Sequence, residues 1–154
     1  MENNTFVVEQ ANLKRDASVI TDFQLKLAFE SEDLKLNSKT VEVGVEHVFK
    51  NPHVGTYYVA LKNEKVVASL LTLKEWSDWR ARNVLWIHSV YVDSEFRRTG
   101  IFKSMYQHLQ EIVDGSDELA GLRLYVDKSN QVAIDTYHFL EMNKEHYHLF
   151  EWLK

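Results

Sequence analysis

Residues 86–115 read WIHSVYVDSEFRRTGIFKSMYQHLQEIVDG and contain three successive patterns. Residues 86–92 are rich in β-branched and aromatic side chains, which indicates a buried strand. Residues 97–100 follow as a short basic turn that ends in a glycine. Apolar residues then recur at helical spacing and predict an amphipathic helix over 101–114. The stretch therefore predicts a strand, a basic turn and a helix in direct succession.

The start of this helix is suited to an anion. The first N–H groups of a helix have no intrahelical partner, and the helix dipole places partial positive charge there. Gly100 lets a bulky anion approach the backbone, and Arg97 and Arg98 add positive charge. Thr99 and Ser104 can add hydroxyl groups. This chemistry favours a pyrophosphate bound after a strand, and the alternative is two solvated arginines before an ordinary helix.

The composition limits the function classes. A chain of 154 residues, 45% of them apolar, suits a single domain over 1–154 with one core. The 18 basic and 23 acidic residues give a net charge of −5, which argues against nucleic acid as a partner and favours cationic or neutral partners. The absence of cysteine excludes disulfides, thiolate metal sites and a cysteine nucleophile. No apolar run is long enough to span a membrane and no signal-peptide pattern is present, so we expect a cytoplasmic protein without a membrane partner.

The rest of the chain predicts a mixed α/β architecture. Strands are expected at 5–10, 56–61, 66–73, 84–92, 122–126 and 146–152, and helices over 40–50, 101–114, 130–141 and from a cap at Asp16. Residues 62–65 read as a hairpin turn, and residues 30–39 and 75–83 read as loops. The order predicts one mixed sheet with helices on its faces.

Two motifs in this setting resemble those of the GCN5-related N-acetyltransferase (GNAT) superfamily. Residues 97–102 resemble its Arg/Gln-x-x-Gly-x-Gly/Ala signature, with Phe102 in place of the usual small residue. Residues 130–142 resemble its Asn-x-x-Ala-x-x-x-Tyr-x-x-x-Gly-Phe element. Asn130, Ala133 and Tyr137 match that element, whereas Glu141 and Met142 replace its Gly-Phe. The resemblance implies a central mixed sheet of about six to seven strands, flanked by about four helices, with two parallel strands splayed apart at the cofactor site.

The resemblance also implies a cofactor, acetyl-CoA, and the residues that bind it. Its pantetheine arm would lie between strands 86–92 and 122–126, and its pyrophosphate would lie on the amides of 98–103. The implied cofactor-binding residues are Val90, Tyr91, Val92, Arg97, Arg98, Thr99, Gly100, Ile101, Phe102, Lys103, Asn130, Ala133 and Tyr137. A backbone N–H near Val90 would stabilise the oxyanion, and Tyr137 matches the usual donor of a proton to the leaving thiolate. The alternative for Tyr137 is a core tyrosine with a hydrogen-bonded hydroxyl.

The catalytic base has several candidates. His88 lies on the strand where the family often carries a glutamate, and it shares a strand face with Trp86. A hydrogen-bonded core histidine is the alternative. Glu30 and Glu32 are rival bases, in a region that borders the acceptor site in the family, and their alternative is a solvated loop. His146 and His148 are interpreted as strand residues, and no metal site is predicted.

The segment 75–80, EWSDWR, resembles a bacterial subgroup of the family. Trp76, Asp78 and Trp79 could bind an ammonium group by cation–π contact and ion pairing, and the alternative is a packed loop or a dimer surface. The acceptor is expected between residues 76–80 and residues 30–36, beside His88. The candidate substrate-binding residues are Glu30, Glu32, Trp76, Asp78, Trp79, Trp86 and His88.

Together these features predict an acetyl-CoA-dependent N-acetyltransferase that acts on a primary amine of a small molecule. Two alternatives are a non-catalytic CoA-binding sensor and an enzyme that acetylates a peptide or protein amine. A homodimer is a possible assembly.

Overall fold

The computed structural model describes residues 6–154, which divide into two compact units, one up to Leu124 and the other Tyr125–Lys154. The first unit contains, in chain order, β1 (Val7–Gln10), α1 (Leu13–Glu32), α2 (Ser38–Lys50), β2 (Thr56–Lys62), β3 (Lys65–Ser77), β4 (Arg82–Val92), a short 3-10 helix η1 (Ser94–Phe96), α3 (Ile101–Asp114) and β5 (Leu119–Arg123). The second contains α4 (Gln131–Phe139). The first predicted strand included Thr5, which lies outside the described residues. The prediction of a single domain over 1–154 stays a prediction.

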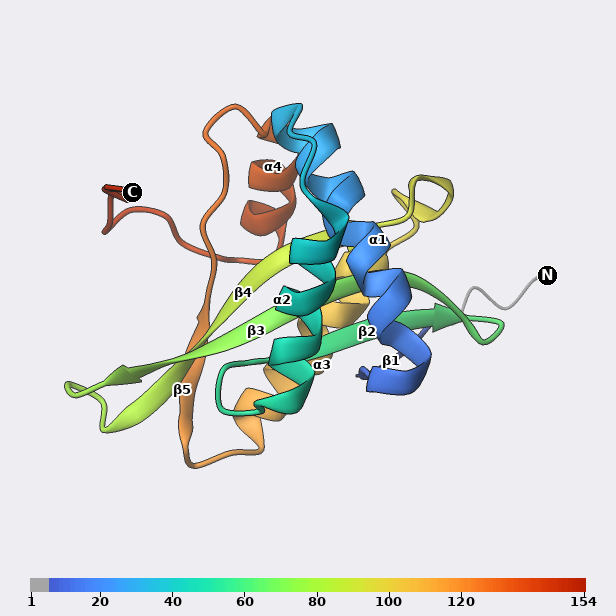
Figure 1. Cartoon of the computed structure of the whole chain (residues 1–154). Helices are drawn as coiled ribbons and strands as arrows, with labels where there is room; N and C mark the ends of the chain where they lie inside the picture. The colour runs from blue at the N-terminus through green and yellow to red at the C-terminus, as the bar shows by residue number, and fades with distance from the viewer. Residues whose placement is uncertain (1–5) are drawn as a thin grey trace. The chain divides into compact units, whose positions relative to one another are not determined.

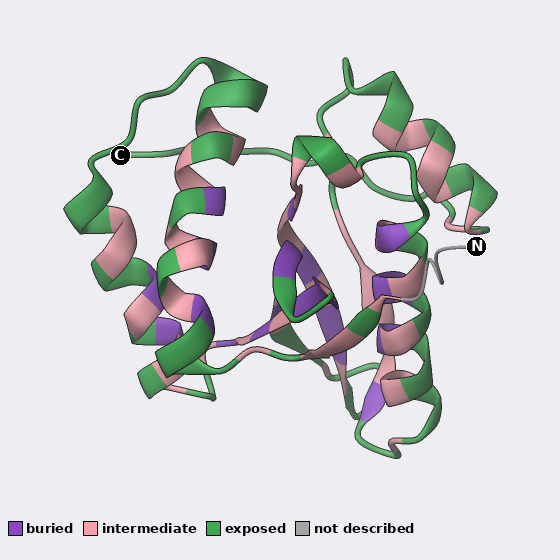
Figure 2. Cartoon of the chain, turned by 90° about the vertical axis from the view of Figure 1, so that its right-hand side faces the viewer, coloured by how far each residue is buried: buried purple, intermediate pink, exposed green. Residues whose placement is uncertain are grey.

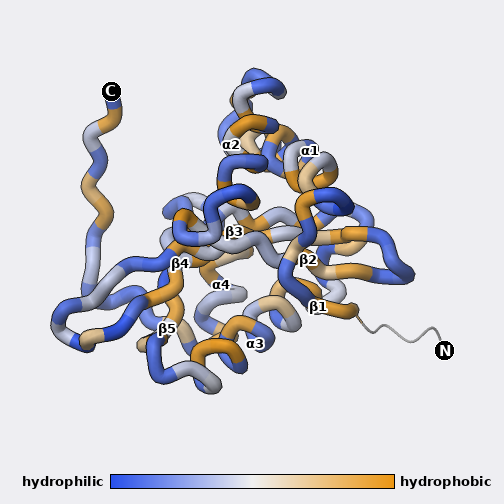
Figure 3. The backbone as a smooth tube through the Cα atoms, turned by 60° about the horizontal axis from the view of Figure 1, so that its bottom comes forward, coloured by the Kyte–Doolittle hydropathy of each residue, from blue (hydrophilic) through white to orange (hydrophobic). Residues whose placement is uncertain are grey.

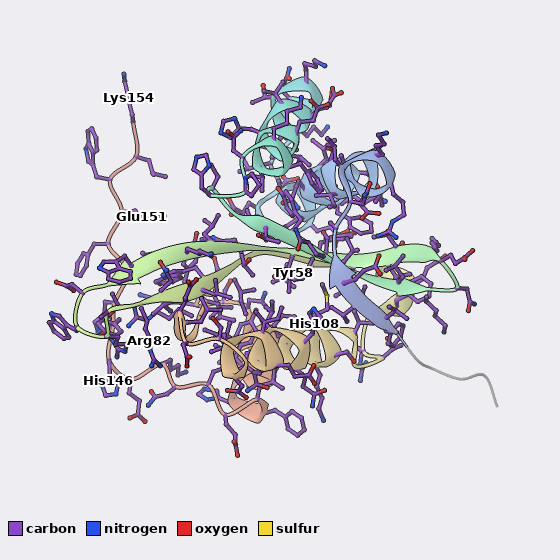
Figure 4. All side chains as sticks on the ribbon, turned by 90° about the horizontal axis from the view of Figure 1, so that it is seen from below. Tyr58, Arg82, His108, His146, Glu151 and Lys154 are labelled. Carbon is purple, nitrogen blue, oxygen red and sulfur yellow. The ribbon has the colours of Figure 1, made fainter. Side chains whose placement is uncertain are left out.

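The first unit is built on one mixed sheet. Its strand order is β1-β2-β3-β4-β5, with antiparallel neighbours except for the parallel pair β4 and β5. Helices α1 and α2 cover one face of this sheet, and α3 covers the other (Figures 1 and 4). The mixed α/β class and the four helices are confirmed, whereas the described residues form five strands rather than six to seven.

Apolar stripes on the helices bury the two faces of the sheet. On the α1 and α2 side, the core cluster is Ile20, Phe23, Val45, Val48, Tyr57, Val59, Leu61, Val66 and Tyr91. On the α3 side, Ile101, Met105 and Leu109 are almost completely buried, as their spacing predicts. His108 of α3 meets Tyr58 of β2 edge-on, with ring centroids 5.7 Å apart (Figure 4). Figure 2 shows the buried residues concentrated on the strands and on the inward sides of these helices.

Two hairpins connect the central strands. Asn63 and Glu64 join β2 to β3 with φ values of 49° and 64°, the left-handed geometry of a tight hairpin turn. The predicted turn at 62–65 is confirmed. The predicted loop at 75–83 is wrong at both ends, because β3 continues to Ser77 and pairs with Arg82, the first residue of β4. The polar composition of these residues predicted a loop, but cross-strand pairing extends the hairpin.

The first helix begins earlier than predicted. Asn12, not Asp16, is its N-cap, and its side chain accepts hydrogen bonds from the amides of Lys14 and Arg15. Asp16 is fully buried, and its carboxylate accepts a 2.7 Å hydrogen bond from the Asn12 amide. The two side chains therefore accept hydrogen bonds from backbone N–H groups at the same N-terminal end of α1, which is typical of helix caps.

The second unit has a capped helix and an extended end. The Asn130 side chain accepts a 3.1 Å hydrogen bond from the Ala133 amide at the start of α4. The strand predicted at 146–152 is wrong, because no strand forms in the described part of this unit. Its residues alternate in hydropathy along an extended trace (Figure 3), yet Tyr147, Phe150 and Trp152 are exposed. Alternation gives a segment its strand pattern but does not supply a partner strand.

Candidate functional site

The parallel strands β4 and β5 share only a short ladder. Their pairs are Asn83–Leu119, Val84–Gly121, Leu85–Leu122 and Trp86–Arg123. The ladder ends there, although β4 continues to Val92. The predicted strand at 122–126 is therefore shifted, since β5 ends at Arg123. The strands are parallel as expected, and they stop pairing well before β4 reaches the basic turn.

A bulge interrupts β4 just beyond that point. Ser69 of β3 pairs with Tyr91, and Leu71 pairs with His88, so β4 contains one residue more than β3 over this interval. Ser89 takes up the difference with a left-handed φ of 51°. A bulge bends the strand and redirects its peptide groups. The change of backbone direction thus falls next to Val90, where the sequence predicted an N–H directed at a ligand.

The turn before α3 has a distinctive backbone. Arg98 and Gly100 both have left-handed φ values, 64° and 85°. Gly100 is the N-cap residue of α3, and no side chain caps this end of the helix. A Cβ added at Gly100 would meet no other atom within 4 Å. Open space therefore lies over a helix N-terminus, the arrangement that accepts phosphate groups.

The hydroxyl groups of Thr99 and Ser104 donate hydrogen bonds to backbone carbonyls close to them in the sequence. Thr99 donates a 2.5 Å hydrogen bond to the Phe96 carbonyl, and Ser104 donates a 3.3 Å hydrogen bond to the Gly100 carbonyl. Both groups therefore shape the turn. The ring of Phe102 lies 6.3 Å from that of Tyr106 along α3, measured between centroids.

Arg97 is exposed, but its side chain contacts three neighbouring residues. Its Nε donates a 2.9 Å hydrogen bond to the Val92 carbonyl, and its Nη2 lies 2.5 Å from Oε2 of Glu30. Its guanidinium lies over the ring of Tyr91, 5.3 Å from the centroid. Glu30 also accepts a 2.8 Å hydrogen bond from the Tyr91 hydroxyl. The structure thus brings together three residues that were predicted to bind either cofactor or substrate.

These contacts shift the ionisation of the two acidic groups. Burial raises the pKa of Glu30, but the hydrogen bonds from Arg97 and Tyr91 outweigh burial and hold that pKa below its ordinary value of 4.5. Burial, and next the hydrogen bond to Glu30, raises the pKa of Tyr91 to about 12. Glu30 is therefore a paired anion at neutral pH rather than a base with a pKa near 7.

His88 and Trp86 lie on the face of the sheet that α1 and α2 cover. His88 pairs with Leu71, which packs against the core under those helices, and cross-strand partners point to the same side. The rings of Trp86 and His88 are 6.2 Å apart between centroids. Burial lowers the pKa of His88 below its ordinary value of 6.5, so its ring is neutral at pH 7. A neutral imidazole can accept a proton, but its role as base stays a prediction.

The tryptophan cluster lies at the tip of the β3–β4 hairpin. Trp76 is 62% exposed and Trp79 is 88% exposed, while the Asp78 carboxylate accepts a hydrogen bond from the Trp79 amide. Glu30 contacts Tyr91, nine residues beyond Arg82 along β4, which corresponds to about 30 Å of strand. The structure therefore does not bring the hairpin tip and the end of α1 together. Glu32, at the last position of α1, is exposed.

The second unit carries the predicted proton donor. Tyr137 lies on α4, and burial raises its pKa above the ordinary value of 10.0. The hydroxyl is therefore protonated at neutral pH, as a proton donor requires. His146 and His148 are exposed, and the described residues contain no group of three side chains that could hold a metal ion. Within the same residues, no helix combines the length and apolar content needed to cross a membrane.

Two features of this site were missed in the sequence. The bulge at Ser89 leaves no local signal, because serine is an ordinary residue within a strand. The Glu30–Arg97 pair joins residues 67 positions apart, and nothing in either segment points to the other. Correlated changes among homologous sequences are the signal that could have found this pair.

Comparison with known proteins agrees with this geometry. The sequence model of the acetyltransferase (GNAT) family matches residues 24–141. A possible acetyltransferase from Clostridium difficile is 37% identical, with a TM-score of 0.89 over 97% of both chains. An aminoglycoside acetyltransferase from an uncultured soil metagenomic sample is 18% identical, with a TM-score of 0.75 over 100% of both chains. A ribosomal-protein-alanine N-acetyltransferase from Brucella melitensis is 13% identical, with a TM-score of 0.79 over 97% of this chain and 100% of the other. No curated protein gave a significant match.

Proposed function

Because this chain belongs to the GNAT family of acetyltransferases, we propose that it transfers an acetyl group from acetyl-CoA directly to a primary amine of a small molecule. One observation carries this proposal. The β4–β5 ladder stops at Trp86, and the same strand then leads into an uncapped helix N-terminus at Gly100. An extended pantetheine arm can add to a strand through backbone hydrogen bonds, and a diphosphate can bind at the helix end.

The residues of the turn fit this cofactor. The left-handed Gly100 leaves room for a phosphate, and Arg98 adds positive charge beside it. Beside the gap in the ladder, Val90 and Val92 would offer their backbone groups to the arm. The amides of 98–103 would hold the diphosphate, and Asn130 and Ala133 remain cofactor residues by the family resemblance alone.

Each step of the transfer has a candidate group on this chain. When bound, acetyl-CoA supplies a thioester whose carbonyl carbon forms a bond to the amine nitrogen as its bond to sulfur breaks. His88 would take the proton that the amine loses. The backbone N–H near Val90 would stabilise negative charge on the carbonyl oxygen, and Tyr137 would give its proton to the departing sulfur.

The acceptor class rests on charge and on the sheet face that carries His88. The net charge of −5 attracts protonated amines. Trp86 and His88 offer aromatic faces on the side that α1 and α2 cover. Further acceptor contacts would come either from Trp76, Asp78 and Trp79 at the hairpin tip or from Glu32 at the end of α1, since these two groups lie apart. Aminoglycosides belong among the test compounds, because an aminoglycoside acetyltransferase shares this fold. A cytoplasmic location and a homodimeric assembly would both fit this role.

Two measurements test the proposal. Isothermal titration with acetyl-CoA should show one binding site per chain, and no binding would contradict the assignment. Release of free CoA should then be followed with polyamines, amino acids, aminoglycosides and short peptides. Turnover with small amines supports the proposal. Turnover with peptides alone would identify a peptide acetylase, and binding without any turnover would identify a CoA-binding module.

A further inference from the structure

We propose that Arg97 is a positioning residue, held by Glu30 and Tyr91, and that Arg98 is the arginine of this pair that meets the phosphates of the cofactor. This inference rests on the proposed function for the identity of the ligand. It changes the assignment of two residues, because the sequence suggested Arg97 as a phosphate ligand and Glu30 as a substrate ligand or base.

The contacts of Arg97 fix its side chain in one place. Its Nε is bonded to the Val92 carbonyl at the end of β4, and its Nη2 pairs with Glu30 at 2.5 Å. The face of the guanidinium lies on the ring of Tyr91. Two nitrogens and one face of this guanidinium are therefore already engaged by the protein, and its charge is paired with Glu30.

The end of α1 gives an independent reason for the pair. The last turn of a helix carries partial negative charge, and the last turn of α1 contains no basic residue. Glu30 adds a further negative charge there. Arg97, which arrives from the far end of β4, supplies the compensating positive charge.

Tyr91 joins the same contacts to the core. Its hydroxyl donates to Glu30, and its ring lies 4.9 Å from that of Phe23 of α1, centroid to centroid. The end of α1, the end of β4 and the start of the basic turn are therefore tied at one point. A turn fixed at its first residue can hold the left-handed backbone of Arg98 and Gly100 before the cofactor arrives, which lowers the entropic cost of binding.

Arg98 differs from Arg97 in its contacts, although both side chains are exposed. It is exposed, and the described part of the chain offers it no ion pair. It lies two residues before Gly100, in the turn that leads to the helix N-terminus. Its charge is therefore available to a ligand, whereas the charge of Arg97 is already compensated.

A test without ligand examines the anchoring directly. Hydrogen–deuterium exchange of the amides in 97–101 should become about two- to fivefold faster in Glu30→Gln and Arg97→Gln, as expected for loss of a partly exposed ion pair. Tyr91→Phe keeps the ring and should give a smaller change in the same direction. Arg98→Gln is the matched control and should leave exchange unchanged. Unchanged exchange in both Glu30→Gln and Arg97→Gln would overturn the inference, whether or not acetyl-CoA binds.

A second test assigns the phosphate contact. Affinity for acetyl-CoA should be measured at several salt concentrations and compared with affinity for S-acetylpantetheine, which lacks the diphosphate. Arg98→Gln should weaken acetyl-CoA binding and reduce its salt dependence, because a screened charge contact is lost. Glu30→Gln and Arg97→Gln should each weaken acetyl-CoA binding about two- to fivefold, keep the salt dependence, and give no further loss when combined.

The opposite pattern would refute the assignment. If Arg97→Gln removed the salt dependence while Glu30→Gln bound acetyl-CoA as tightly as the wild type, Arg97 would be the phosphate ligand. Failure of the wild type to bind acetyl-CoA would instead contradict the proposed function, and the exchange measurement would still decide whether Arg97 anchors the turn.

Discussion

Trp86 lies opposite Arg123 in the last pair of the parallel β4–β5 ladder. Beyond this pair β4 continues to Val92, whereas β5 has ended. Arg123 also reaches across β4 to Glu75 of β3, with Nη1 and Oε1 2.9 Å apart. The ion pair between Arg123 of β5 and Glu75 of β3 therefore links the outer and inner strands next to the point where the ladder ends. The bulge at Ser89 comes next along β4, and the turn at Gly100 comes after the strand has ended at Val92.

Substitution of Gly100 by valine should weaken acetyl-CoA binding at least tenfold. The residue has φ +85°, which costs a non-glycine residue roughly 1–2 kcal/mol. The added side chain would also occupy the open space above the helix N-terminus. Isothermal titration measures the affinity, and urea unfolding measures the strain. Gly100→Asn is the control, since asparagine tolerates this backbone and isolates the effect of obstruction. Wild-type affinity in the valine variant would exclude a phosphate at this position.

Removal of the Tyr137 hydroxyl should slow turnover and leave the affinity for acetyl-CoA nearly unchanged. The hydroxyl of the half-buried Tyr137, with its raised pKa, stays protonated at pH 7 and would donate only to the departing sulfur. A loss of about 10²-fold in kcat for Tyr137→Phe would fit general-acid catalysis. Rapid-quench measurement of the chemical step provides the check. Equal rates for that step in the wild type and the variant would remove Tyr137 from the mechanism.

The activity should fall as the pH falls below the ordinary histidine pKa. Burial lowers the pKa of His88, so the neutral form that accepts a proton persists below 6.5 and is lost only at more acidic pH. Because the unfolded chain would take up this proton first, the stability that His88 contributes is fully present above 6.5 and also declines as the pH falls. Circular dichroism must therefore accompany the kcat/KM profile. His88→Gln should reduce turnover and flatten the acid limb, and an unchanged limb would identify another base.

Alanine substitution of Trp79 should change acceptor kinetics only slightly. The side chain is 88% exposed, and cation–π contact at exposed sites contributes about 0.5–1 kcal/mol, or two- to fivefold in KM. Trp76→Ala, at 62% exposure, should have an effect of the same order. The acceptor KM should rise while the KM for acetyl-CoA stays constant. If neither variant changes acceptor kinetics, the hairpin tip lies outside the acceptor site.

The sequence predicted those elements whose ends carry their own chemical signals. The helix over 101–114 is placed correctly at both ends, because glycines at 100 and 115 flank a strict apolar stripe. The β2–β3 turn is likewise set by local residues, Asn63 and Glu64. In such segments, the local pattern and the final structure agree.

The errors arose where a distant partner decides the outcome. Residues 75–83 are polar, yet Trp76 pairs with Asn83 and the hairpin continues. Residues 146–152 alternate like a strand but form no ladder in the described chain. At the candidate site, the carboxylate of Glu30 marked it as a candidate in the sequence, but its partner could not be predicted. The contact with Arg97 exists only once α1 packs beside β4.

The short connections between the central strands suggest an order of folding. Only two residues separate β2 from β3, whereas β5 reaches β4 after α3, and β1 reaches β2 after both α1 and α2. Closing a longer loop costs more chain entropy, so we expect the β2–β3–β4 meander to form in the transition state and the outer strands to join later. Val59→Ala in β2 should then give a φ-value of about 0.5 or more, and Leu119→Ala in β5 one below about 0.3. Stopped-flow refolding measures both, and the reverse ranking would refute this order. On this account, the β4–β5 ladder beside the candidate cofactor site forms after the central meander and opens before it.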